Sequence, residues 1–232
     1  MNDIVKIPFL LLFLALARRN LSPPAARALK EEKAPSTRLE FILDRNFAKI
    51  MKTVYSALAV VEILTIVYHS VPSSQTALLP GLHVQVEGRL HLTPAYCLCL
   101  ALALLGTLIR VSAFSRLGHM FTYEMSVLKD HKLITNGPYA WVRHPAYTGV
   151  FLFFISAGCC ITAEGSWLRE SGILGSTVGQ VATASFFAFQ LTVTTALCTR
   201  IQKEDEAMQK SFGEEWERWA RVVKWKLVPG LI

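Results

Sequence analysis

Long apolar runs separated by short polar segments dominate the hydrophobic pattern of this chain. Four runs approach or exceed the roughly 20 apolar residues that a helix needs to cross a bilayer, and they cover residues 47–69, 92–109, 147–163 and 173–199. A fifth run, residues 4–17, is short for a span and also resembles the core of a signal peptide, but no small-residue cleavage site follows it. The pattern therefore predicts about five membrane-spanning helices, of which the first is short.

Composition places the chain in the same class. Hydrophobic residues make up 52% of the sequence and charged residues 18%, whereas soluble domains are about one quarter charged. These values argue against a soluble globular enzyme and indicate an all-α, multi-span transmembrane helical bundle. The five cysteines lie in or at the end of apolar runs without paired spacing, so we expect neither a disulfide framework nor a metal site.

Basic residues concentrate on one side of the predicted spans. The net charge is +7, but Lys and Arg lie between apolar runs, which favours membrane lipid over nucleic acid as a partner. With five spans, 21 of the 24 basic residues share one side, and only Lys6, Arg89 and Arg169 lie opposite. Because cytosolic loops collect Lys and Arg, we predict that segment 110–144 and the C-terminal tail face the cytosol.

Two features inside the predicted spans have structural interpretations. Gly172, Gly175 and Gly179 have a spacing that favours close packing between helices. Glu62 falls midway along its span, where a carboxylate is costly and usually faces a partner or a cavity. The sequence leaves open whether Glu62 is functional or only bonds to a neighbouring helix.

The polar segment 131–149 links the third and fourth long runs and carries the first set of candidate residues. Residues 136–138 mark a turn, and Pro145 suits the first turn of the next helix. On composition alone, Arg143 is a snorkelling residue at the membrane boundary. An interfacial aromatic belt would then be formed by Tyr139, Trp141 and Tyr147.

The C-terminal tail, residues 200–232, carries the second set. Arg200 and Glu204 are four residues apart and share one helix face, a spacing also common in surface salt bridges. Ser211 and Glu214 resemble a capping box, which predicts a helix break near Gly213.

An amphipathic stripe runs along the same tail and predicts a cytosolic amphipathic helix. Such a stripe can lie on the membrane surface or pack over segment 131–149. Its apolar members are Ile201, Met208, Phe212, Trp216, Trp219 and Val223.

Taken together, the two polar segments resemble the isoprenylcysteine carboxyl methyltransferase family. The resemblance covers about residues 105–232 and lies in three motifs. They are His131-x-Leu133-Ile134-Thr135-x-Gly137-x-Tyr139, then Arg143-His144-Pro145-x-Tyr147-x-Gly149, and finally Arg200-Ile201-x-x-Glu204 with Phe212-Gly213-x-Glu215. The middle motif alone is less specific, because sterol reductases and phospholipid methyltransferases look similar there.

The resemblance implies methyl transfer from S-adenosylmethionine to the C-terminal carboxylate of a prenylated cysteine at the endoplasmic reticulum membrane. It implies a catalytic region over residues 105–232, preceded by membrane spans and a basic loop over residues 1–104. Arg200 is implied as the substrate-binding residue, and Arg200 and Glu204 as the catalytic pair. The implied cofactor-binding group is Glu124, His131, Lys132, Leu133, Ile134, Tyr139, His144, Pro145, Ala146, Tyr147 and Glu204.

The chain also departs from the family pattern. Asp205 stands where a second glutamate is usual, and Glu124 stands where the family can place a cofactor-contacting glutamine. In the tail, Trp216 and Trp219 replace common tyrosines, and Lys224 replaces a frequent proline.

The residue types suit a carboxylate acceptor. An arginine can hold a carboxylate through a charge-assisted pair, and an ionised acceptor needs no general base, so positioning dominates. The alternative with the same donor is a phospholipid N-methyltransferase, whose amine acceptor is disfavoured by Arg200. A third alternative is sterol reduction, but membrane sterol reductases usually have more spans than this chain provides. The non-catalytic alternative is a lipid-binding protein whose basic loops contact anionic lipid headgroups.

Overall fold

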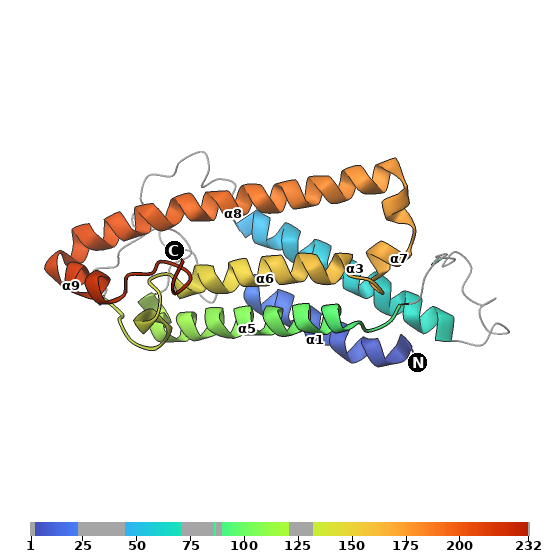
Figure 1. Cartoon of the computed structure of the whole chain (residues 1–232), viewed down its shortest axis with the longest axis horizontal. Helices are drawn as coiled ribbons and strands as arrows, with labels where there is room; N and C mark the ends of the chain where they lie inside the picture. The colour runs from blue at the N-terminus through green and yellow to red at the C-terminus, as the bar shows by residue number, and fades with distance from the viewer. Residues whose placement is uncertain (1–2, 23–44, 71–85, 87–89, 121–131, 232) are drawn as a thin grey trace.

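The computed structural model is a helical bundle whose long helices run roughly along one axis (Figure 1). It describes residues 3–22, 45–70, 86, 90–120 and 132–231. All regular elements of these residues are helical, which confirms the predicted all-α class. The main helices are α1 (Ile7–Asn20), α3 (Arg45–Ser70), α5 (Pro94–Leu117), α6 (Pro145–Thr162), α8 (Thr177–Phe212) and α9 (Glu214–Val222). The short elements are η1 (Asp3–Lys6), η3 (Gly118–Met120), η4 (Gly137–Ala140), α7 (Trp167–Glu170) and η5 (Ile173–Gly175).

Four segments of the described chain are long and apolar enough to cross a membrane. They correspond to the four long runs of the sequence and cover Phe47–Ser70, Pro94–Leu117, Pro145–Glu170 and Thr177–Phe212. The fifth predicted span, residues 4–17, becomes η1 followed by α1, whose 14 residues extend about 21 Å at 1.5 Å per residue. This helix is shorter than the other four segments and is not one of those long enough to cross a membrane.

The last long helix, α8, is longer than the sequence pattern predicts. It begins at Thr177, four residues after the start of its apolar run, and continues to Phe212. Its 36 residues extend about 54 Å, whereas the hydrocarbon core of a bilayer is about 30 Å thick. The polar C-terminal turns therefore project beyond the apolar region, and these turns carry Arg200 and Glu204.

Helices α5 and α6 pack side by side (Figure 1) because two glycines let their backbones approach. A Cβ on Gly106 would lie 2.7 Å from the carbonyl oxygen of Gly149, and a Cβ on Gly149 would lie 2.5 Å from that of Gly106. Neither position can accept a side chain without moving a helix. The contact sets the position of the first turn of α6.

The predicted role of Gly172, Gly175 and Gly179 in helix packing is wrong. Gly172 has φ 70°, in the left-handed region that favours glycine, and it precedes the short helix η5 rather than lying within a span. A Cβ on Gly179 would collide with the backbone of Ile173, six residues earlier in the chain. Gly172 and Gly179 let the chain fold back tightly at the start of α8, whereas a Cβ on Gly175 would meet nothing within 4 Å.

Glu62 has a structural role. Its Oε1 is 2.5 Å from the Nζ of Lys6, and its Oε2 accepts a hydrogen bond from the backbone N–H of Trp167 at 3.1 Å. Lys6 is buried and also donates to the carbonyl oxygen of Gly165 at 2.7 Å. An unpaired buried charge is strongly unfavourable, so Lys6 and Glu62 must remain paired. The pair and its hydrogen bonds therefore hold the N-terminal segment, α3 and the start of α7 together.

The two polar segments meet at one end of the bundle. Helices α1, α5 and α8 all run toward this end, where α6 begins and α9 follows α8 (Figure 1). This arrangement brings together the ends of the helices that the charge asymmetry assigns to one side. It also places the candidate residues of α6 and α8 next to each other.

Candidate active site

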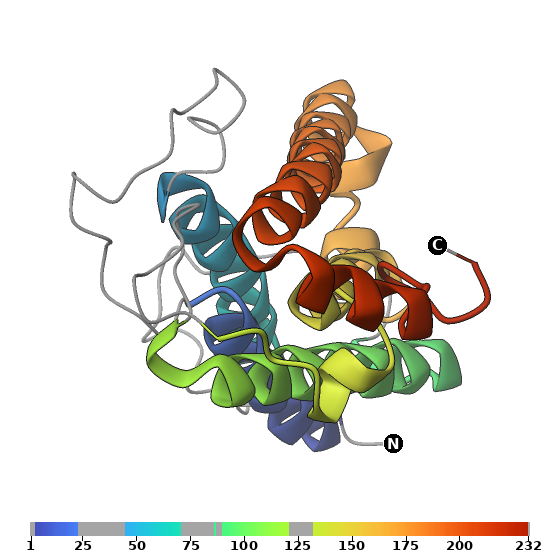
Figure 2. The same cartoon turned by 90° about the vertical axis from the view of Figure 1, so that its left-hand side faces the viewer.

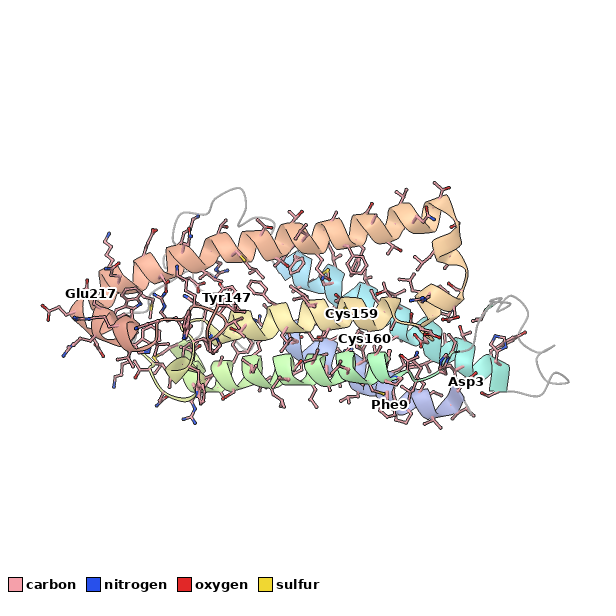
Figure 3. The ribbon with its side chains drawn as sticks, viewed as in Figure 1. Asp3, Phe9, Tyr147, Cys159, Cys160 and Glu217 are labelled. Carbon is pink, nitrogen blue, oxygen red and sulfur yellow. The ribbon has the colours of Figure 1, made fainter. Side chains whose placement is uncertain are left out.

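The first turn of α6 presents the residues of the middle motif. His144 is the N-cap residue and Pro145 occupies the first helical turn, as the sequence predicts. Proline suits this position because the first backbone N–H groups of a helix have no intrahelical partner. Figure 3 shows Tyr147 at the end of α6 that lies nearest α9, whereas Cys159 and Cys160 lie toward its other end.

Four of the predicted site residues lie together in one cluster, and three of them are joined by hydrogen bonds. Glu204 of α8 is the shared acceptor: its Oε1 receives the hydroxyl of Tyr147 at 2.7 Å and the Nε of Arg200 at 2.8 Å. The Nδ1 of His144 lies 3.8 Å from Glu204 Oε2. The side chain of Glu204 remains 26% exposed, so it can still reach a ligand.

Asp205 forms a second set of contacts directly beside the first. Its Oδ1 is 2.8 Å from the Nε2 of His144. Its Oδ2 lies 3.3 Å from Arg143 Nη1 and 3.2 Å from Lys226 Nζ. The two ring nitrogens of His144 thus face two successive carboxylates of α8, which orients the ring.

The C-terminal tail packs over the start of α6 (Figure 2). The backbone N–H groups of Arg143 and His144 donate to the carbonyl oxygens of Trp225 and Lys226, both at 2.9 Å. The hydroxyl of Thr148 donates to the carbonyl of Leu227 at 2.7 Å. Of the two positions open to the amphipathic stripe, the structure therefore shows packing over the polar segment.

Tryptophans of the stripe take part in this packing. Trp216 is buried, with the guanidinium of Arg143 5.6 Å from its ring centre. The indole N–H of Trp219 donates to the carbonyl oxygen of Tyr139 at 3.3 Å. The side chain that seemed suited to snorkelling, Arg143, is instead enclosed between α8 and the tail.

The predicted break near Gly213 is confirmed, but the capping box is wrong. Helix α8 ends at Phe212, and Gly213 adopts φ 50°, a left-handed conformation that favours glycine. Gly213 is also the N-cap residue of α9, so Ser211 lies inside α8 and does not cap the following helix. The boundary between α8 and α9 is therefore set by Gly213, which can adopt the turn conformation, and not by capping from the Ser211 hydroxyl.

Charge and burial keep Tyr139 protonated. Burial raises the pKa of its phenol above the ordinary value, and the negative charge of Glu204 raises the pKa further, while the positive charge of Arg110 opposes both effects. At neutral pH the phenol is therefore a neutral hydrogen-bond donor.

The remaining predicted cofactor residues are less closely joined to the cluster. Pro145 and Ala146 lie in the first turn of α6 between His144 and Tyr147. Lys132 is exposed, and its backbone N–H points to the sulfur of Met120 at 3.4 Å. Leu133 and Ile134 are half-buried. Glu124 and His131 lie outside the described residues.

Comparison with known proteins links this geometry to a family. A model of the isoprenylcysteine carboxyl methyltransferase family matches residues 99–164, which include most of α5, the middle motif and all of α6. Over these residues the chain is similar to this family. The match includes His144 and Tyr147 but ends before Arg200 and Glu204.

Individual relatives extend the similarity to about half of the chain. Protein-S-isoprenylcysteine O-methyltransferase from Schizosaccharomyces pombe is 32% identical over 121 residues, or 51% of this chain and 43% of the relative. The protein of the same name from Dictyostelium discoideum is 28% identical over 128 residues, covering 54% and 46%. That from Saccharomyces cerevisiae is 41% identical over 56 residues, or 23% of each chain. The chain spans about half the length of the first two relatives.

Three contributors to the candidate site were not among the predicted site residues. Asp205 carried a signal, since it directly follows Glu204 and two adjacent acids at the end of an apolar run are costly unless paired. Arg110 lies just past the run 92–109 and was counted only as a loop charge, whereas α5 continues through it to Leu117. Nothing in the sequence indicated a role for Lys226, because its ion pair with Asp205 depends on how the tail folds back.

Proposed function

We propose that this chain transfers the methyl group of S-adenosylmethionine to the C-terminal carboxylate of a prenylated cysteine. The observation that carries the proposal is the cluster of Arg200, Glu204, Tyr147 and His144, formed by the two polar segments at one end of the bundle. The family match and the relatives' names support the same reaction. We further propose that residues 105–232 form the catalytic region.

The donor set of the cluster suits S-adenosylmethionine. This cosubstrate supplies a methyl group on a positively charged sulfur and also carries an ammonium, a carboxylate and ribose hydroxyls. Glu204 can accept hydrogen bonds from an ammonium or from hydroxyl groups, and Tyr139, Tyr147 and His144 add polar groups of both kinds. We also assign the family-implied residues to this site: Glu124, His131, Lys132, Leu133, Ile134, Pro145 and Ala146.

Arg200 is the proposed acceptor-side residue. Its Nε is bound to Glu204, which fixes the plane of the guanidinium relative to α8. A guanidinium held in this way can orient a carboxylate, and the side chain is only 13% exposed, so water screens the interaction weakly. Because a carboxylate acceptor is already ionised, the residues need only desolvate it and aim it.

The membrane setting fits a lipid-modified substrate. Helix α8 is largely unburied in its apolar part, where the side chain of Leu191 is 67% exposed. A prenyl chain can lie in the hydrocarbon beside this helix, since each buried methylene contributes about 0.8 kcal/mol. We propose that the site end faces the cytosol in the endoplasmic reticulum membrane, as the 21 basic residues on this side favour.

The test is a competition assay on the full chain in lipid vesicles. Radiolabelled S-adenosylmethionine is supplied with a farnesylated cysteine acid and with phosphatidylethanolamine, and both products are measured. We expect a base-labile methyl ester. Arg200→Ala and Glu204→Ala should each lower its rate by about 100-fold or more, as for groups that position reactants.

Two comparisons make this test specific. Gln202→Ala is the matched control, because Gln202 lies on the same turn of α8 and is exposed, and its rate should equal that of the wild type. Labelled phosphatidylethanolamine without ester would identify a phospholipid N-methyltransferase. A protein that neither binds the donor nor forms a product would instead be a non-catalytic membrane protein.

A further inference from the structure

Arg110 of α5 bridges two helices that are distant in sequence. Its Nη1 donates to the carbonyl oxygen of Ala146 at 2.7 Å, in the first turn of α6. Its Nε donates to the carbonyl oxygen of Asn20 at 3.0 Å, at the last residue of α1. The guanidinium also lies 4.6 Å from the ring centre of Phe114, which limits its freedom.

The glycine contact between α5 and α6 makes this bridge possible. A Cβ on Gly149 would lie 2.8 Å from both the Cβ and the backbone nitrogen of Arg110. Any larger residue at position 149 would therefore push Arg110 away from the first turn of α6. The final glycine of the middle motif thus provides the space that the arginine side chain occupies.

A second contact ties α1 to α5 one turn earlier. The side-chain amide of Asn20, which is fully buried, donates to the hydroxyl of Thr107 at 3.2 Å. Helix α1 lies outside residues 99–164, the part that the family model matches. Two polar links therefore connect α1 to α5, and one of them continues through Arg110 to the site.

We propose that Arg110 is a positioning residue of the methyl transfer, holding the first turn of α6 against the end of α1. The proposal rests on the proposed function. Ala146 lies between His144 and Tyr147, which are assigned to the donor site, so a shift of this turn moves both side chains. Arginine is required because its planar fork reaches two carbonyl groups in fixed directions, whereas lysine offers a single charged head.

The test compares Arg110→Gln and Arg110→Lys with the wild type as full chains in vesicles. We expect Arg110→Gln to raise the KM for S-adenosylmethionine about tenfold or more, as expected for loss of charge-assisted bonds. The KM for the prenylcysteine acceptor should stay unchanged, because Arg110 is assigned no acceptor contact. Arg110→Lys should give an intermediate donor KM. Arg169→Gln is the control, since Arg169 is an exposed arginine of α7 at the other end of the bundle.

A second measurement is independent of turnover. Hydrogen exchange is followed at the amides of Tyr147 and Thr148, which donate to the carbonyl of His144, and at Leu21, which donates to the carbonyl of Ala17. In Arg110→Gln all three should exchange faster, because both helix ends lose a partner. If the wild type makes no ester, the proposed function fails and this exchange pattern alone decides whether Arg110 holds the two ends.

Three results would overturn the proposal. Unchanged exchange at Tyr147 and Thr148 would show that the first turn does not depend on Arg110. Faster exchange in α6 without a change at Leu21 would remove the bridge to α1. Equal changes in both KM values and in kcat, with a smaller folded fraction, would indicate general destabilisation instead of positioning.

Discussion

Replacing Asp205 with asparagine should release the C-terminal tail from the start of α6. Asp205 is 8% exposed, and its carboxylate contacts His144, Arg143 and Lys226 at 2.8, 3.3 and 3.2 Å. Asparagine keeps the size of the side chain but removes the charge. Arg143 and Lys226 then lose the carboxylate that faces them, although asparagine can still accept one hydrogen bond.

The size of this effect follows from the geometry. Breaking a buried ion pair by removing one partner costs about 3–5 kcal/mol. The side chain of Lys226 is 32% exposed, so solvent weakens its interaction with Asp205. We therefore expect the free energy that anchors the tail to fall by about 3 kcal/mol, the lower end of this range. This loss corresponds to an increase of about 100-fold in the population with the tail released.

Amide hydrogen exchange measures this population directly. The N–H groups of Arg143 and His144 are bonded to carbonyl oxygens of the tail, so their exchange requires the tail to open. In Asp205→Asn we expect both amides to exchange about 100-fold faster, the factor set by the lost anchoring free energy. Asp205→Glu, which keeps the charge, should stay close to the wild type, as should Glu206→Gln at the exposed neighbour. Wild-type exchange at both amides in Asp205→Asn would refute the anchoring role.

The other two predictions concern stability. Gly149→Ala should lower the thermal midpoint by overpacking against the Gly106 carbonyl oxygen, at a cost of about 1–3 kcal/mol, whereas Gly175→Ala, with nothing within 4 Å of the added Cβ, should be nearly neutral; equal midpoints for the two variants would contradict the close approach. Glu62→Gln should destabilise the chain by about 3–5 kcal/mol because it leaves Lys6 buried without its counter-charge. The double variant Lys6→Met with Glu62→Gln should recover most of the lost stability in the same denaturation assay, and failure to recover any would argue against charge pairing.

The apolar pattern predicts the spans well because long runs in a bilayer must form helices that satisfy their own backbone groups. It predicts their ends less well. Helix α8 continues 13 residues past the run that ends at residue 199, because helical turns remain favourable after the chain leaves the apolar region. The glycine spacing at residues 172, 175 and 179 was also misread: it suits packing between helices, but the left-handed φ of Gly172 makes a turn before α8.

The candidate site was predicted in part. Arg200 and Glu204 are one helical turn apart, so their contact follows from sequence spacing alone. The meeting of Glu204 with Tyr147 joins residues 57 positions apart, and only the family resemblance suggested it. The contacts of Asp205 and Arg110 depend on how α6, α8 and the tail cross, which no local pattern encodes.

By itself, the sequence determined that the chain is a multi-span helical protein, because this follows from local hydrophobicity. Its resemblance to a known family indicated which short polar segments to propose as the site. The tertiary structure decided the rest. It showed that the tail covers the start of α6, that both ring nitrogens of His144 face carboxylates of α8, and that Arg110 links α1 to α6. These arrangements depend on contacts between residues far apart in the chain, and such contacts are set by the close approach of helix backbones and the need to pair buried charges.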